Sequence, residues 1–458
     1  MSEVLVGVLG FLCIIAIVVT LFKSLTLPSI AFILFPSILA LILVIGGYYS
    51  FDNIAALIKA GFNSTGPTAA LFVFSVLYFG IMTDAGMFDV IIGKLMGLVG
   101  DSVIGVCMMT AVIALIGHLD GGGASTFCIV VPAMLPVYKK MHMRPTTMLR
   151  IAVLSMGVLN LMPWAGPTMR AASVLGMEAG KLWNTLLPIQ IFGIILSLAH
   201  AFLAGMQEKA RGAGLNGRLA MEGGDVEEEE DEESEVKGND PALARPHLFI
   251  FNVLLTIAVI AMLIWDVFPS YVPFMCGVVV ALLVNYPGAK LQKKIINLHA
   301  GPALTMCSTL MAAAVLMGIL VKSVTVNDVA VASVVTCMSN LIKMVLPAAL
   351  GRHLPLVIGI LSVPLALAFD TDSYFYGMLP VMIGIGQGFG IDALPIAVAM
   401  VVCRNCATFI SPMVPATLLG VGLAIVDIKD HIKASFMYVW GFSILCMLFA
   451  IMLGIMPF

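Results

Sequence analysis

Continuous apolar stretches, each long enough for one helix, recur along the chain and are separated by short polar or basic segments. A helix needs about 20 apolar residues to cross the hydrocarbon core of a bilayer, and most of these stretches approach that length. Apolar and polar positions do not alternate within them, which argues against a transmembrane β-barrel. The pattern therefore predicts an all-α polytopic membrane protein with about ten transmembrane helices.

Two polar interruptions fall in the middle of apolar stretches. Residues 117–126 read GHLDGGGAST, and residues 369–377 read FDTDSYFYG. Hydrocarbon offers no hydrogen-bond partner to a free backbone group, so such a break is tolerated only where protein or water supplies one. We interpret the two segments as the tips of two re-entrant hairpins, over residues 102–138 and 343–385, which meet to form one site.

A helix that is broken at prolines follows each hairpin. The first covers residues 146–175 and breaks at MPWAGPT, and the second covers residues 393–425 and breaks at ISPMVPAT. When Asp120 is aligned with Asp370, the prolines of the two breaks also come into register. The order of elements is therefore the same in both halves of the chain, which indicates an internal repeat.

Basic residues predict opposite orientations for the two repeats. The connector after the first hairpin carries Lys139, Lys140 and Arg144, whereas residues 384–392, after the second hairpin, contain neither lysine nor arginine. Lysine and arginine collect on the cytoplasmic side of a membrane protein. We therefore predict an inverted repeat, the arrangement found in many secondary transporters.

Composition separates a membrane body from a linker. Hydrophobic residues make up 61% of the chain and charged residues 11%, and the mean hydropathy is +1.09. Residues 222–240 hold 11 of the 26 acidic residues and one lysine, which leaves 15 acidic and 22 basic residues elsewhere. We predict a first repeat over 1–206, an acidic, disordered cytoplasmic linker over 207–246, and a second repeat over 247–458.

The charge balance also narrows the function classes. A basic body suits an anionic substrate, although cytoplasmic lysine and arginine explain part of the excess. The sequence contains no nucleotide-binding loop and no catalytic triad, and nothing in it indicates a nucleic-acid partner. These features argue against an autonomous enzyme and against an ATP-driven pump.

Ionisable side chains at the two tips are candidates for metal or proton coupling. Asp120, Asp370 and Asp372 offer the hard oxygen ligands that Mg²⁺ and Ca²⁺ prefer, and they could equally exchange protons. His118 is a candidate proton carrier. The alternative explanation is that each aspartate caps the helix that follows it and that His118 is a packing residue.

Arg404 is the one cation that the pattern places deep in a predicted helix, and its guanidinium suits a carboxylate substrate. An ion pair with one of the aspartates would also explain it. Hydroxyl and amide groups near the tips and breaks, and glycines that permit close backbone approach, complete the candidate set. Helix capping and close packing are the alternatives for these residues. The further candidates for substrate binding are Gly121, Gly122, Gly123, Ser125, Thr126, Asn160, Thr371, Ser373, Asn405, Thr408 and Ser411.

At GHLDGGGASTF, FDTDSYFYGMLPV and NCATFISPMVPAT the sequence resembles the citrate–divalent-metal/proton symporter (CitMHS) family of the ion transporter superfamily. The resemblance covers nearly the whole chain. It implies a homodimer in which each protomer has a scaffold and a moving transport domain that works by an elevator-like motion. It further implies citrate chelated to Mg²⁺ or Ca²⁺ as the cargo, coupling to protons, and no permanently bound cofactor.

Two classes of function remain open on the sequence alone. The first is a secondary transporter of citrate or a related di- or tricarboxylate in a bacterial-type plasma membrane, including a cation-coupled dicarboxylate transporter without metal chelation. The second is the membrane subunit of a sodium-pumping decarboxylase complex, which would also need inverted halves and intramembrane aspartates.

Overall fold

The computed structural model describes residues 1–23, 25–98, 100–215, 242–265, 267–326, 329–344 and 347–457. In these ranges eight helices are long and apolar enough to cross a membrane, and five shorter apolar helices accompany them. The predicted all-α polytopic membrane class is confirmed. One arm of the first hairpin, Val103–Asp120, is among the eight. The long helices fall short of the expected ten because both broken helices are divided into short segments and the helix Tyr271–Asn285 is also short.

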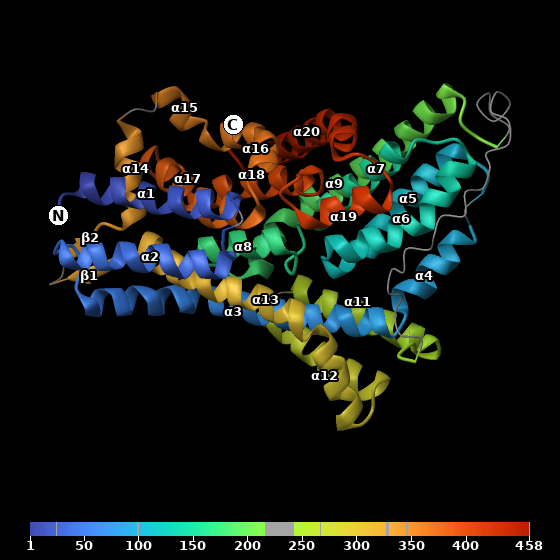
Figure 1. Ribbon diagram of the computed structural model, residues 1–458, viewed down its shortest axis with the longest axis horizontal. Coiled ribbons are helices and arrows are strands. Elements are labelled where there is room, and N and C mark those ends of the chain that lie inside the picture. The colour runs from blue at the N-terminus through green and yellow to red at the C-terminus, as the bar shows by residue number, and fades with distance from the viewer. Residues whose placement is uncertain are drawn as a thin grey trace.

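Helices of the first half follow one another in an order that the second half repeats (Figure 1). The first half comprises α1 Glu3–Phe22, α2 Pro28–Ile45, α3 Phe51–Asp84, α4 Met87–Met96, α5 Val103–Gly117, the 3₁₀ turn η1 His118–Asp120, α6 Gly123–Lys140, α7 Pro145–Leu159, α8 Gly166–Leu175 and α9 Ala179–Arg211.

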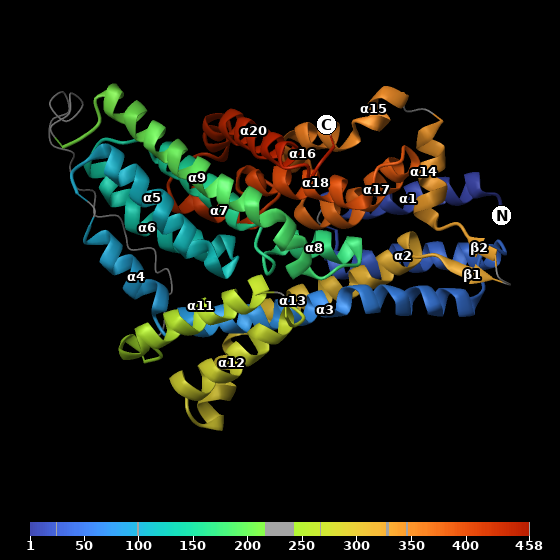
Figure 2. The same cartoon turned by 180° about the vertical axis from the view of Figure 1, so that it is seen from behind.

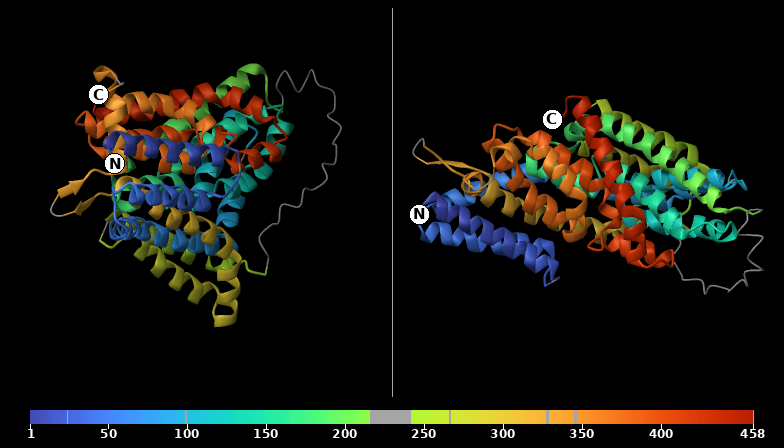
Figure 3. Two further views of the ribbon diagram at one scale, coloured as in Figure 1. Left: turned by 60° about the vertical axis from the view of Figure 1, so that its left-hand side comes forward. Right: turned by 90° about the horizontal axis from the view of Figure 1, so that it is seen from above.

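The second half adds a small β-hairpin and one extra short helix to the same order. It comprises η2 Pro246–Leu248, α11 Phe249–Trp265, α12 Tyr271–Asn285, α13 Ala289–Val321, strands β1 Val324–Val326 and β2 Val329–Val331, α14 Val334–Lys343, α15 Ala348–Arg352, α16 Leu354–Ala368, the π-helical turn η3 Ser373–Met378, α17 Leu379–Gly388, α18 Ala393–Cys406, η4 Thr408–Ile410, α19 Pro415–Leu423 and α20 Ile428–Met452. The antiparallel strands β1 and β2 project from the helical body (Figure 3).

The helices pack in two groups that lie one above the other in Figure 1, and the view from behind in Figure 2 shows the same division. The α3–α13 group consists of α2, α3, α11, α12 and α13. The hairpin group consists of α5–α9 and α16–α20. Helix α8 and the turns η1 and η3 lie on the side of the hairpin group that faces α3 and α13. The polar tips are therefore held where the two groups meet.

Close packing of α3 against α13 depends on two glycines. A Cβ atom at Gly61 would collide with the carbonyl oxygen of Ala314, and one at Gly318 would lie 2.5 Å from the carbonyl oxygen of Leu57. Both neighbours are backbone atoms, which cannot move aside as a flexible side chain can. The two long antiparallel helices are thus locked together at backbone contact.

Both polar interruptions form the tips of helical hairpins, as predicted. In the first, α5 ends at Gly117, and Gly121 adopts φ +72°, a conformation that glycine takes without strain. In the second, α16 ends at Ala368, and the chain re-enters a helix through the π-helical turn η3.

Both helices that follow the hairpins are interrupted, again as predicted. α7 stops at Leu159 and α8 begins at Gly166 with Pro167 in its first turn; α18 stops at Cys406 and α19 begins at Pro415. Proline fits the first turn of a helix because its missing N–H would have no partner there. Pro167 and Pro415 therefore start the second segments, whereas Pro163 and Pro412 lie within the breaks.

The start of the predicted linker is ordered, because α9 continues to Arg211. Glu208 is fully buried and accepts hydrogen bonds from Arg144 Nε at 2.6 Å, Thr147 Oγ1 at 2.7 Å and Arg211 NH2 at 2.8 Å. These bonds fasten the end of α9 to the connector after the first hairpin. Residues 216–241, where most of the predicted linker falls, lie outside the described residues.

Candidate functional site

The carboxylate of Asp120 holds the turn between η1 and α6. Its Oδ1 atom accepts a hydrogen bond from Gly122 N at 2.7 Å, and its Oδ2 atom accepts one from Ser125 Oγ at 2.5 Å. Gly122 is the N-cap residue of α6, and no described side chain accepts from the free N–H groups in the first turn of that helix. Asp120 therefore stabilises the tip itself, and its side chain is only partly buried and remains open to a ligand.

Close packing at two glycines and one indole hydrogen bond hold the first tip in place. Gly121 packs against the backbone of Trp164 and Ala165, while a Cβ atom at Gly123 would collide with the ring of Phe409. Trp164 Nε1 donates a hydrogen bond to the carbonyl oxygen of Leu119 at 2.8 Å. The loop after α7 thus holds the tip in place, and the glycines serve close packing here.

His118 is fully buried and connects the first tip to the first break. Its Nδ1 atom lies 2.7 Å from Thr126 Oγ1, and its Nε2 atom lies 3.1 Å from Asn160 Oδ1. When Thr126 donates its one hydroxyl proton to the Gly122 carbonyl, 2.7 Å away, Nδ1 is the donor to Thr126. Nε2 can then donate to Asn160 Oδ1 only in the imidazolium form; a neutral ring requires the Asn160 amide to present its NH₂ group instead. The proton state of His118 and the orientation of Asn160 are therefore linked.

The two breaks contact each other through Asn160 and Asn405. The backbone carbonyl of Asn160, at the end of α7, accepts from Thr168 Oγ1 at 2.8 Å and from Asn405 Nδ2 at 2.9 Å. Two atoms of this buried pair, Asn160 Nδ2 and Asn405 Oδ1, have no hydrogen-bond partner. Buried amide atoms are rarely left unpaired, so each is an available contact for a ligand or for water.

Asp370 caps the helical segment of the second tip. Its Oδ2 atom accepts hydrogen bonds from Asp372 N at 2.9 Å and from Ser373 N at 3.2 Å. Thr371 lies between Asp370 and Asp372 in the chain, and its Oγ1 atom is 3.5 Å from the NH2 nitrogen of Arg404. The second tip therefore presents one carboxylate next to one arginine.

Arg404 is fully buried and has weak partners only. NH2 donates to the carbonyl oxygen of Phe369 at 3.3 Å, NH1 donates to Thr408 Oγ1 at 3.2 Å, and Nε has no partner. The guanidinium carbon lies 5.6 Å from the ring centre of Tyr374. Among the described residues no carboxylate forms an ion pair with it, so the alternative of an Arg404–aspartate pair does not hold.

Arg170, a residue that the sequence analysis missed, pairs with Asp372. Arg170 Nε lies 2.6 Å from Asp372 Oδ1, and the exposed fractions of the two side chains are 8% and 15%. The expectation that Arg404 is the one cation deep in a predicted helix is therefore wrong. A basic residue three positions after Pro167, within a broken membrane helix, was the signal that could have found it.

The predicted residues fall into two clusters joined by a bridge. One cluster is the first tip with His118 and Thr126, the other is the second tip with Arg404 and Thr408, and Asn160 and Asn405 join them. Ser411 is buried and caps the turn before α19 by accepting from Met413 N at 3.2 Å. Within the described ranges no three histidine, cysteine, aspartate or glutamate side chains gather as a metal site, so Asp120, Asp370 and Asp372 do not form one cluster.

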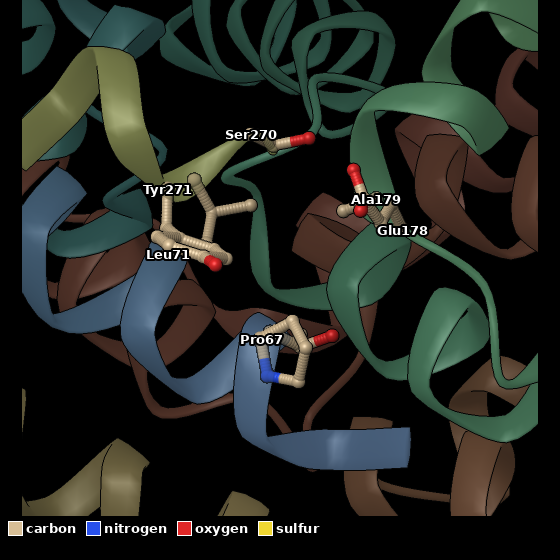
Figure 4. Close-up of a pocket in the computed structure, with 7 residues that line it drawn as sticks. Pro67, Leu71, Glu178, Ala179, Ser270 and Tyr271 are labelled. Carbon is tan, nitrogen blue, oxygen red and sulfur yellow. The ribbon is translucent and has the colours of Figure 1, made fainter. Parts of the chain in front are cut away.

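A small cavity of the protein lies elsewhere. It is lined by Pro67 and Leu71 of α3, by Glu178 and Ala179 at the corner between α8 and α9, and by Ser270 and Tyr271 at the start of α12 (Figure 4). None of the candidate residues lines it. The cavity instead marks where the corner before α9 meets the α3–α13 group.

An all-α membrane protein with two hairpin tips and two interrupted helices, built from a repeated order of elements, has the architecture of a secondary transporter. The chain belongs to the citrate transporter family CitMHS, whose family model matches residues 4–403. Members of this family are transporters, so the protein is not an enzyme, and the alternative of a decarboxylase subunit is wrong. The family and the eight apolar helices identify a multi-pass membrane protein, consistent with a bacterial plasma membrane.

Two relatives from one bacterium match this chain over nearly its whole length. A "Citrate transporter" of Bacillus subtilis (strain 168) is 34% identical over 99% of this chain and 100% of its own length. A "Mg(2+)/citrate complex secondary transporter" of the same organism is 32% identical over 94% of each chain. The crystal structure of the Alcanivorax borkumensis YdaH transporter is similar in fold, with a TM-score of 0.53 at 14% identity, over 89% of this chain and 90% of that one.

Proposed function

We propose that this protein carries citrate, as a complex with a divalent metal ion, across the membrane by alternating access. The observation that carries the proposal is Arg404, a fully buried guanidinium beside the second tip that has no carboxylate partner in the described part of the chain. A buried charge without a counter-charge is costly. A carboxylate of the cargo would supply that counter-charge and could form two parallel hydrogen bonds with the planar group.

Asp120 and Asp370 argue that a cation accompanies the anion. Two carboxylates near the same site repel citrate unless a cation or a proton neutralises them. Carboxylate oxygens are ligands that Mg²⁺ and Ca²⁺ prefer, and both ions keep part of their coordination shell for a bound substrate. The name of the Mg²⁺/citrate relative supports a complex as the cargo of this chain as well.

The unpaired amide atoms of Asn160 and Asn405 extend the candidate site between the two tips. Asn160 Nδ2 can donate to a carboxylate or hydroxyl of citrate, and Asn405 Oδ1 can accept from a citrate hydroxyl or from a metal-bound water. Ser125, Thr371 and Ser373 add hydroxyl groups near the starts of helices, where the helix dipole favours carboxylates. Coupling to protons would act through Asp120, Asp370 or His118.

The two packing groups suggest how the site changes sides. The α3–α13 group is locked at backbone contact and suits a static scaffold, while the hairpin group carries both tips and both breaks. Movement of the hairpin group past α3 and α13 would carry the cargo with the site, in an elevator-like motion. A homodimer would anchor the scaffold of each protomer in the membrane.

Uptake of radiolabelled citrate into proteoliposomes tests this function. We expect saturable uptake that requires Mg²⁺ or Ca²⁺, is abolished by EDTA, and responds to an imposed pH gradient. Uptake of citrate that is unchanged by EDTA would favour a dicarboxylate or citrate transporter without metal chelation. Absence of citrate transport under every ion condition, in a protein that inserts correctly, would contradict the proposal.

A further inference from the structure

Arg170 and Asp372 form a buried ion pair between the two halves of the chain. Arg170 lies on α8, just after the first break, and Asp372 lies in the second tip, 202 positions away. The Nε–Oδ1 distance is 2.6 Å, and both side chains are largely shielded from solvent. The pair is therefore a charge-assisted hydrogen bond in a place where a lone charge would be expensive.

The surroundings of Arg170 are shaped for its guanidinium. Gly166, one turn earlier on α8, leaves room for it, because a Cβ atom there would lie 2.7 Å from Arg170 NH1. Its NH2 group lies 3.8 Å from Met306 Sδ on α13, so the pair borders the α3–α13 group. Within the described residues Asp372 is its only carboxylate partner.

The pair reduces the number of uncompensated charges at the two tips. Arg170 and Asp372 cancel each other, which leaves Asp120, Asp370 and Arg404 without ion-pair partners among the described residues. A secondary transporter that carries cargo in one direction must also return empty, and every unpaired charge at the two tips opposes that return. Guanidinium cannot be deprotonated in a protein, so Arg170 stays a cation in both forms of the carrier.

We propose that Arg170 is a built-in counter-ion for Asp372, which neutralises the second tip when no cargo is bound and so allows the unloaded carrier to change sides. The proposal rests on the proposed function, because it presupposes a carrier that crosses both loaded and empty. It assigns Asp372 to the return step and not to direct coordination of the metal. Arg170 is a positioning residue in this account, since it acts through Asp372.

Two modes of transport separate this role from a merely structural one. Self-exchange, with citrate and Mg²⁺ on both sides of the proteoliposome, needs only the loaded carrier to cross. Net efflux into citrate-free buffer needs the empty carrier to return as well. Loss of a structural tie would slow both modes alike. Loss of the counter-ion slows net efflux selectively, because in the loaded carrier the positive charge of the cargo's metal ion offsets Asp372, whereas in the empty carrier nothing does.

In Arg170→Gln we expect self-exchange within about twofold of the unmodified protein and net efflux lower by at least about tenfold, since Asp372 is left unpaired. Asp372→Asn, which leaves Arg170 unpaired, should show the same selective loss. The double variant R170Q/D372N has neither charge and should recover most of the net efflux, which a double-mutant cycle measures directly. Arg170→Lys keeps the charge and should keep more net efflux than Arg170→Gln.

Arg150→Gln is the matched control. Arg150 is also a buried arginine without a described carboxylate partner, but it lies on α7 against the ring of Tyr438, 4.0 Å from the ring centre. Its substitution should leave the ratio of net efflux to exchange unchanged. Equal losses in both modes for Arg170→Gln, or a double variant no better than the single ones, would overturn the proposal. An unmodified protein that does not exchange citrate at all would overturn the proposed function, and this inference with it.

Discussion

The side-chain amide of Asn405 donates a hydrogen bond to the backbone carbonyl of Asn160 over 2.9 Å, although 245 positions separate the two residues. Each asparagine stands where a broken helix ends its first segment, so this bond ties the two breaks together. Carbonyl groups at a helix end have no partner within the helix, and here side chains from the other half and from α8 supply one. The two halves of the chain therefore meet at one hydrogen-bonded centre, formed by Asn160 and Asn405.

Asn405→Ala should weaken both this centre and the binding of citrate. The change removes one donor to the Asn160 carbonyl and leaves a cavity, which costs about 1–3 kcal/mol of unfolding free energy. It also removes the unpaired Oδ1 atom that we assign to the cargo. Thermal unfolding in detergent measures the first effect, and the citrate concentration at half-maximal uptake measures the second.

Asn252→Ala is the control for this change. Asn252 of α11 and Asn285 of α12 exchange two hydrogen bonds of 2.9 Å, are equally buried, and lie in the α3–α13 group away from the candidate site. Its loss should lower the unfolding temperature by a similar amount without changing the apparent affinity for citrate. If Asn405→Ala also leaves that affinity unchanged, Asn405 has only a structural role.

Arg404→Lys tests the contact with the cargo carboxylate. Lysine keeps the positive charge but loses the planar fork that forms two parallel hydrogen bonds. We expect the apparent affinity for citrate to fall by about tenfold while the protein still inserts and keeps its unfolding temperature within a few degrees. Full affinity in Arg404→Lys would place the contact with the citrate carboxylate elsewhere. Arg404→Met removes the charge altogether. If Arg404→Met fails to insert while Arg404→Lys inserts normally, the charge of Arg404 is purely structural.

The fold could be predicted from the sequence where hydrocarbon imposes a strict rule. A glycine-rich, aspartate-bearing segment inside an apolar stretch has few possible structures in a membrane, so both hairpin tips were located correctly. The prolines located both broken helices for the same reason. The end of α9 was placed too early, because the contacts that order Glu208 come from Arg144 and Thr147 on a distant segment.

Individual contacts within the site were less accessible to sequence analysis. The alignment of Asp120 with Asp370 indicated two equivalent tips, and each carboxylate does accept a backbone hydrogen bond within its own tip. It gave no indication that Asp372 faces Arg170, because that pair depends on how α8 packs against the second tip and not on any local pattern. The bridge from Asn160 to Asn405 likewise arises only when both breaks are brought together.

The acidic linker gives a prediction that rests on composition. Residues 222–240 lack the apolar surface needed to offset the entropy of ordering, and we predict that they are dispensable for transport. Deleting them should leave the rate of citrate uptake nearly unchanged. Complete loss of uptake in a correctly inserted deletion variant would show that the linker is required.

Glu208→Gln should instead lower the unfolding temperature, since it weakens the charge-assisted bonds to Arg144 and Arg211.

Asp120→Asn separates metal binding from proton coupling at the first tip. Asparagine keeps one oxygen to accept from Gly122 N, so the turn at the tip largely survives and the unfolding temperature should change little. If Asp120 binds the metal of the cargo, the concentration of Mg²⁺ at half-maximal citrate uptake should rise by at least about tenfold, because a carboxylate ligand has been replaced by a weaker neutral one.

If Asp120 carries the coupling proton instead, the same variant should show a different pattern. Its Mg²⁺ requirement should stay the same, uptake should no longer respond to an imposed pH gradient, and citrate exchange should remain active. Ser125→Ala is the control for the local structure, because it removes the bond to Asp120 Oδ2 and keeps the charge. Unchanged metal and pH dependence in Asp120→Asn would restrict this aspartate to holding the turn of the first tip and would leave Asp370 as the carboxylate that faces the cargo.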